Sequence, residues 1–201
     1  MFRNLVFRIK WALVIMGVVL LAAGIYYFVM AHKTPYDINL IDDSEIKAGM
    51  LVEGDIYGNY GAYEETYTTR YGVKESSTAS WYYVIPVANE SFMGLSVNAK
   101  QYGNQFELQS EQTYDYLTEA TDQRPMIIHV KGKISKMDKK DQELYNEYLS
   151  DIGFTNSEIS QYCLPLYIKN QSFEGYLALL LSGAGCLIVG ILLIVLLRKK
   201  A

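Results

Sequence analysis

The chain of 201 residues has few side chains suited to acid–base or nucleophilic catalysis. Its histidines are His32 and His129, and its cysteines are Cys163 and Cys186. A hydrolase needs a nucleophile beside a base that a third group orients. The sequence has neither the Gly-x-Ser-x-Gly turn of a serine hydrolase nor a phosphate-binding glycine loop. Nucleophilic catalysis therefore has little basis in these residues.

His129 lies in the run of residues 126–133, which predicts a strand. Because successive strand side chains point to opposite faces, His129 shares the wetter face with Lys131. Its own segment holds no carboxylate that could orient it. Cys163 is interpreted as a buried structural cysteine. We predict that His129 is not catalytic and that the chain is not an enzyme.

Carboxylates are the plentiful chemical groups, and all 22 lie within residues 33–174. Glu64 and Glu65, flanked by tyrosines, are the most suggestive pair, because paired carboxylates perform acid–base chemistry on sugars. A solvent-facing strand edge is the interpretation we favour. The acidic residues of segment 37–45 lack the glycine and the closing glutamate of an EF-hand loop. No residue set has metal-ligand spacing, so we predict no cofactor-binding site, no metal site and no cofactor.

Two long runs without a charged residue stand near the ends of the chain, at residues 11–31 and 176–197. A helix of 21 residues spans roughly 31 Å, which matches a hydrocarbon core about 30 Å thick. Both runs therefore predict transmembrane helices. The alternative for the first run is a cleaved signal peptide, but the run is longer than the usual apolar region of one. An uncleaved signal anchor is favoured.

The charges are segregated around these runs. Residues 1–10 and 198–201 each carry three basic residues and no acid, whereas residues 33–174 have a net charge of −10. Basic flanks of membrane spans stay in the cytoplasm. We predict a multi-pass protein of the plasma membrane with two cytoplasmic tails and an extracytoplasmic domain at residues 32–175. The lipid bilayer is its predicted partner, and the acidic domain disfavours nucleic acid.

The intervening domain alternates strand-like and helix-like segments. Strands are predicted at residues 50–57, 62–71, 78–87, 92–100, 126–135 and 164–169. A helix is predicted at residues 111–120 with Ser110 as its cap, and a second at residues 138–152 with Asp138 as its cap. Gly153 then ends the second helix. The expected fold class is an α+β, β-rich domain, with a mainly antiparallel sheet or a small barrel, flanked by two transmembrane helices.

Small side chains recur every four residues along the second apolar run. They are Ala178, Ser182, Cys186 and Gly190. Such a stripe allows close approach of helix backbones in a membrane. We predict that it packs against another helix. The partner is either the first run, which has Gly17 and Gly24 seven residues apart, or another membrane protein.

Three short segments carry a resemblance to known families. Residues 49–56 (GMLVEGDI), 81–86 (WYYVIP) and 130–134 (VKGKI) resemble a family of two-pass bacterial membrane proteins of unknown function. The plan of the chain is also similar to the intermembrane domain of the two-pass mitochondrial E3 ubiquitin ligases. Those ligases carry a RING after the second span, and this sequence has only four residues there. The resemblance implies architecture and no catalytic residue.

The composition of the outer domain favours a binding role. Sixteen of the 18 tyrosines lie within residues 36–176. Tyrosine is common both at protein interfaces and in strands. Our first hypothesis is a binding or accessory module for another membrane or envelope protein, with an unknown ligand. The alternative is an extracellular ligand-sensing ectodomain, and a cell-envelope hydrolase ranks last.

Overall fold

The computed structural model describes residues 2–70, 73–171, 173 and 175–198. It divides into two compact units. The first comprises residues 1–33 and 172–201, and the second comprises residues 34–171. The boundaries lie close to the predicted domain at residues 32–175.

The first unit is a pair of helices, α1 (Phe2–His32) and α5 (Tyr176–Arg198). Within them, Arg8–His32 and Tyr176–Leu196 are long and apolar enough to span a membrane. Residues 2–10 of the predicted N-terminal tail are part of α1, because neither glycine nor proline interrupts them. Residues 199–201 of the predicted C-terminal tail lie outside the described residues.

Glycines bring α1 and α5 into close contact. Gly17 lies against Gly183 and Leu187, and a side-chain carbon at Gly183 would come within 2.8 Å of the Leu21 backbone nitrogen. Gly190 is buried against Val14. Only small residues permit such an approach between two helices.

Of the predicted four-residue stripe, Gly190 lies in this contact. Cys186 is half-buried, whereas Ala178 and Ser182 are exposed in the pair. A spacing of four residues advances about 40° around a helix at each step, so the stripe drifts away from any straight contact. The contact instead alternates spacings of three and four residues. Its members on α5 include Leu180, Gly183, Leu187 and Gly190. Association of Ala178 and Ser182 with another protein stays a prediction.

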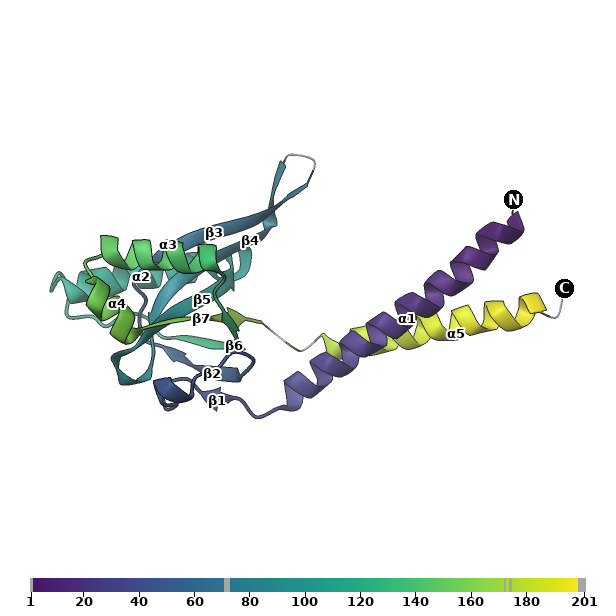
Figure 1. The fold of residues 1–201 in the computed structure, drawn as a ribbon, viewed down its shortest axis with the longest axis horizontal. Helices are drawn as coiled ribbons and strands as arrows, with labels where there is room; N and C mark the ends of the chain where they lie inside the picture. Colours follow the sequence, from purple (N-terminus) through teal and green to yellow (C-terminus); the bar gives the residue numbers. More distant parts are fainter. Residues whose placement is uncertain (1, 71–72, 172, 174, 199–201) are drawn as a thin grey trace. The chain divides into compact units, whose positions relative to one another are not determined.

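The second unit is built on one sheet of seven strands (Figure 1), in the order β1-β2-β6-β7-β5-β4-β3. The strands are β1 (Tyr36–Asp37), β2 (Leu51–Ile56), β3 (Ala62–Arg70), β4 (Val73–Pro86), β5 (Phe92–Asn98), β6 (Ile128–Lys136) and β7 (Cys163–Asn170). The pairs β1–β2 and β5–β7 are parallel, and the other four pairs are antiparallel. The sheet is therefore mixed and mainly antiparallel. The predicted alternative of a small barrel is wrong, because the order of pairing ends at β1 and β3.

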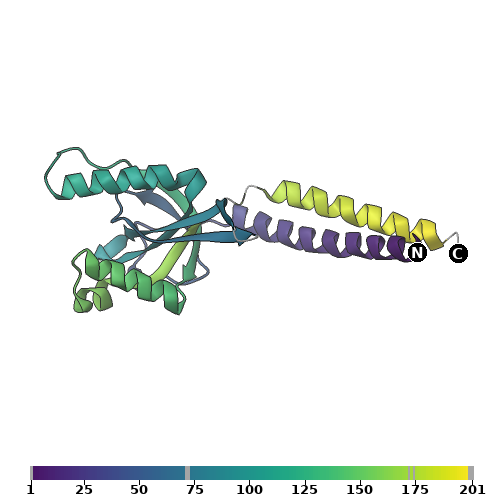
Figure 2. The same ribbon diagram turned by 90° about the horizontal axis from the view of Figure 1, so that it is seen from above.

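Helices cover both faces of this sheet (Figure 2). On one face lies α2 (Asn104–Leu117), which follows a π-helical turn at Ala99–Gly103. On the other lie α3 (Lys139–Asp151) and α4 (Asn156–Tyr162). Two short 3-10 turns, η1 (Asp43–Glu45) and η2 (Ala88–Glu90), complete the unit.

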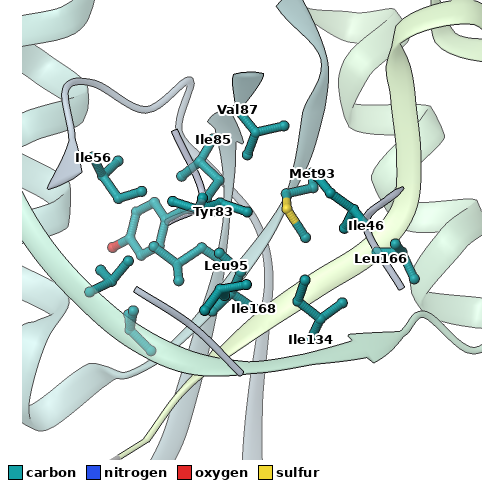
Figure 3. Packing of buried hydrophobic residues seen from close by; sticks show 14 of the residues in the cluster. Ile46, Ile56, Tyr83, Ile85, Val87, Met93, Leu95, Ile134, Leu166 and Ile168 are labelled. Atoms are coloured by element: carbon teal, nitrogen blue, oxygen red, sulfur yellow. The ribbon is translucent and has the colours of Figure 1, made fainter. Parts of the chain in front are cut away.

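The core has two parts because the side chains of strand β4 alternate between the two faces of the sheet. Tyr83 belongs to the cluster under α2, together with Phe106, whereas its neighbour Val84 belongs to the cluster under α3, with Leu149. Figure 3 shows the first cluster, to which strands β4 to β7 contribute. Its fully buried members include Tyr83, Leu95, Ile134 and Ile168.

The helix predictions succeed where a cap is decisive. α3 begins after Asp138, whose side chain accepts a hydrogen bond from the Asp141 backbone N–H, and Gly153 follows with φ of 106°. The prediction for residues 111–120 is wrong at its start. Ser110 lies inside α2, where its hydroxyl donates to the Phe106 carbonyl. The helical segment begins earlier because the Asn98 side chain caps it, accepting from the Gln101 N–H at the end of β5.

Helix α4 was not predicted, although its sequence contains a signal. Thr155 and Glu158 form a capping box, in which each side chain accepts from the backbone N–H of the other. The helix has only seven residues, which is too short for a repeating apolar pattern to indicate it.

Candidate binding cleft

A cleft of about 800 Å³ lies at the start of β3. Its floor is the β2–β3 connection at residues 59–61, and its walls are α2 and the end of α3 with the residues that follow. The wall residues include Ser110, Glu111, Tyr114, Leu117, Tyr148, Ile152 and Phe154. α2 and α3 cover opposite faces of the sheet, and both reach the edge strand β3. The cleft lies between them at that edge.

The floor is attached to α2 by Asn59, which is 1% exposed. The Asn59 side-chain amide donates to the Phe106 carbonyl at 3.0 Å and to Gln109 Oε1 at 2.9 Å. Its carbonyl oxygen Oδ1 accepts from the Gly61 N–H at 3.0 Å, and it shares the single hydroxyl proton of Ser110 with the Phe106 carbonyl. A buried asparagine with all of these partners fixes the conformation of its loop.

Gln109 extends this network to the rest of the unit. It is fully buried, and its Nε2 donates to the carbonyl oxygens of Ile56 and Met126, each at 2.7 Å. The Thr113 hydroxyl donates to the Gln109 carbonyl and accepts from the Asn59 N–H. One polar network therefore joins α2 to β2 and to the segment before β6.

α3 holds the same floor from the other side. The Tyr148 hydroxyl donates to the Tyr60 carbonyl at 2.6 Å. Gly61 has φ of 99°, and a side chain there would collide with the Tyr148 hydroxyl. The cleft is thus preformed, with its floor bonded to both of its walls.

The walls expose a concentration of apolar and aromatic surface. Tyr114 is 69% exposed, Leu117 is 56% exposed and Ile152 is 40% exposed. Gathered exposed hydrophobic side chains of this kind mark binding surfaces in soluble domains. The rigid floor and the apolar walls together suit a macromolecular or amphipathic ligand.

A second cavity of about 510 Å³ continues from the cleft along β3. The two cavities share Gly61, Ser110 and Glu111. The second adds Trp81, Tyr83, Glu64, Glu65 and Glu107 to the lining. No lysine, arginine or histidine appears among the described residues that line either cavity.

The side chains of Glu64 and Glu65 point to opposite faces of the sheet. Glu65 is paired across the strands with Trp81, on the side of α2. The Glu64 side chain, 6% exposed, lies 3.7 Å from Lys140 near the start of α3. Burial, and next the charge of Asp141, raises the pKa of Glu64. Glu64 is more buried than the solvent-facing edge residue that we predicted, and the prediction that the pair forms no acid–base site stays a prediction.

The space below α3 holds tyrosine hydroxyls in an apolar setting. The Tyr63 ring packs against Tyr82 and Tyr145, and burial raises the pKa of Tyr63 and of Tyr145. Burial also raises the pKa of the neighbouring Cys163 thiol to about 11. The thiol is therefore protonated at neutral pH, which suits a structural cysteine and not a nucleophile.

His129 has an orienting carboxylate that its own segment does not supply. Its Nδ1 lies 2.9 Å from Asp55 Oδ1 on the paired strand β2. Both side chains are exposed, at 63% and 45%. No grouping of three or more histidine, cysteine or acidic residues among the described residues could hold a metal ion.

The acidic segment at residues 37–45 shapes the local backbone. Asp42 accepts from the Ser44 N–H and hydroxyl, and Asp37 accepts from the Asn39 N–H. Asp43 accepts from the Ser91 hydroxyl at 2.7 Å. These carboxylates cap turns and tie η1 to the residue after η2.

Sequence reasoning missed the residues that build the cleft. Gly58 and Asn59 have the composition of a turn, and nothing in the sequence distinguishes Gln109 and Thr113. The surplus of tyrosines was the available signal, since Tyr60, Tyr114 and Tyr148 all line the cleft.

Residues 2–198 match one protein-family model, described as "Domain of unknown function (DUF8577)". No curated protein and no solved structure matches the chain.

Proposed function

The chain belongs to the DUF8577 family, and we propose that it is a two-pass membrane protein whose folded unit binds another membrane or envelope protein. The observation that carries the proposal is the preformed cleft between α2 and α3. Its exposed apolar walls and its hydrogen-bonded floor fit a binding site better than a site for covalent chemistry.

Membrane insertion is supported by the apolar surface of α1 and α5 that remains exposed in the helix pair. Of the two apolar spans, 17% and 11% are buried. A core helix of a soluble protein would be mostly buried, whereas a lipid-facing helix keeps its apolar side chains on the outside. Lipid is therefore the environment we propose for α1 and α5.

The charges support the proposed orientation. The basic residues beyond both spans would hold the two termini in the cytoplasm, and the acidic unit at residues 34–171 would lie outside. A plasma membrane of a bacterium fits a folded domain of this size without disulfides, in agreement with the free state of Cys163. The resemblance that the sequence suggests to the intermembrane domain of the mitochondrial ligases supports only the proposed order of segments.

Orientation is tested by thiol labelling in intact cells. A Cys163→Ser background carries either Leu40→Cys, at a position 81% exposed, or Ala201→Cys. An impermeant thiol reagent should label the cysteine at position 40 and not the cysteine at position 201. Labelling at position 201 with protection at position 40 would reverse the proposed topology.

The binding role is tested by photo-crosslinking in the native membrane. A photoreactive amino acid at Tyr114 should give an adduct with a second protein. The same group at Leu40 is the matched control, since Leu40 is an exposed apolar residue that lines neither cavity. Equal adducts at both positions, or none at Tyr114, would contradict the proposal. An adduct with a small molecule alone would favour the ligand-sensing alternative.

A further inference from the structure

We propose that the cleft receives an extended basic segment of the partner protein, which pairs with the outer edge of β3 as an additional strand. This inference rests on the proposed binding function and names the chemistry of the partner. It joins three observations: the position of β3 in the sheet, the groove beside it and the charge of that groove.

β3 stands at an end of the sheet, with β4 as its paired neighbour among the described strands. It is nine residues long and contains neither lysine nor proline. Natural proteins usually protect an edge strand with such residues, with bulges and inward charges, or by making it short, and of these devices β3 has the two register shifts and the inward Glu64. The opposite edge follows that rule, because β1 has two residues. A long edge strand is a template for the addition of another strand.

The groove runs along this edge on the side of α2. A register shift between Ala62 and Glu64 turns both Tyr63 and Glu64 toward α3. The small side chain of Ala62 and the side chain of Glu65 remain on the side of α2, where the Trp81 ring lines the second cavity. An incoming strand would therefore have a side-chain pocket beside the backbone groups with which it pairs.

The charge of the groove selects the occupant. Glu65, Glu107 and Glu111 are exposed and line the second cavity, and Asp115 lines the first. Glu107, Glu111 and Asp115 are spaced four residues apart on α2, so they occupy one face of that helix. None of these carboxylates has an ion-pair partner within the part of the chain described.

Lysine or arginine side chains on an extended partner would meet these carboxylates, while alternate apolar side chains would meet Trp81 and Leu117. A second copy of this chain fits poorly, because the outer unit is itself acidic and its β3 edge carries the same two glutamates. We therefore expect the groove to bind a basic, extended segment of a different protein.

The test selects twelve-residue peptides from a random displayed library on the full-length chain in lipid nanodiscs. Enriched peptides should alternate lysine or arginine with valine, isoleucine or aromatic residues, and should lack proline. The best synthetic peptide should slow hydrogen exchange of the β3 backbone amides. N-methylation of its alternate backbone nitrogens should weaken binding at least tenfold, because strand pairing needs those donors.

Two matched variants separate the groove from general acidity. Glu65→Gln/Glu107→Gln/Glu111→Gln should weaken binding at least tenfold and remove its salt dependence. Glu143→Gln/Glu147→Gln/Asp151→Asn makes the same change of net charge on exposed positions of α3 outside both cavities, and should stay within twofold of wild type. The unfolding transition of each variant, followed by Trp81 fluorescence in a Trp11→Phe background, confirms that it folds.

The inference is overturned by failure to enrich peptides, by enrichment of acidic or uncharged ones, or by unchanged exchange at β3. A partner adduct at Tyr114 together with any of these results would leave the binding function standing without the strand-pairing mode. Absence of the adduct would instead remove the binding function itself.

Discussion

Asn59→Ala is the substitution that most directly tests how the cleft is built. Asn59 is buried, and its side chain makes four hydrogen bonds that join the β2–β3 connection to α2. Alanine removes all four and adds no strain at an ordinary backbone position. The variant should unfold at lower temperature and should lose the fixed floor of the cleft.

The expected loss of stability depends on which hydrogen-bond partners of Asn59 are left without another partner. The Phe106 carbonyl and the Ser110 hydroxyl still bond to each other at 2.9 Å. Gln109 Oε1 and the Gly61 N–H lose the partner that Asn59 supplied. Each buried polar group left unsatisfied costs about 1–3 kcal/mol. Water that enters from the cleft would offset part of this, so we expect a loss of about 3 kcal/mol.

The assay is thermal unfolding of the full-length chain in detergent. Trp11→Phe leaves Trp81, at the second cavity, as the fluorescent reporter. A loss of about 3 kcal/mol should lower the midpoint by about 10 °C for a unit of this size. Gln105→Ala is the control, because Gln105 is an exposed residue of the same helix. If Asn59→Ala stayed within about 0.5 kcal/mol of that control, the network would not hold the floor and the reasoning would fail.

Three further substitutions test other parts of the structure. Glu64→Gln should stabilise the unit at residues 34–171 by about 1 kcal/mol at pH 7, because it removes a charge that burial has taken out of water. The raised pKa of Glu64 means that the folded protein holds the carboxyl proton more tightly than the unfolded chain does. The difference in stability between wild type and Glu64→Gln should therefore vanish in melts below about pH 4, where Glu64 is protonated in both the folded and the unfolded chain. Gly183→Leu should weaken the α1–α5 pair by about 1–2 kcal/mol, seen as reduced crosslinking between cysteines placed in the two helices, whereas Ser182→Leu should not. His129→Ala should change the free energy of unfolding by less than about 1 kcal/mol, since its pair with Asp55 is exposed, and a larger loss in a urea titration would show a role beyond that pair.

Local sequence patterns determined the elements of this protein well where one short segment contains the whole signal. The apolar runs at residues 11–31 and 176–197 lie within α1 and α5, because twenty uncharged residues leave few alternatives to a long helix. Asp138 and Gly153 bound α3 as predicted, because capping depends on bonds within a few residues. Alternation likewise located β2 and β6, where one face of each strand is buried.

Tertiary structure alone decided how these elements meet. The parallel pairing of β5 with β7 joins residues some seventy positions apart, and no local pattern encodes it. Likewise, Asn59 reads as a turn residue until Gln109, 50 residues away, reaches it in the folded unit. On α5, side-chain size alone suggested a stripe through Ser182, but the contact runs through Gly183 because two packed helices touch along spacings of three and four residues. The cleft depends on α2 and α3 reaching the same edge from opposite faces of the sheet, which is a property of the assembled sheet and of no single segment.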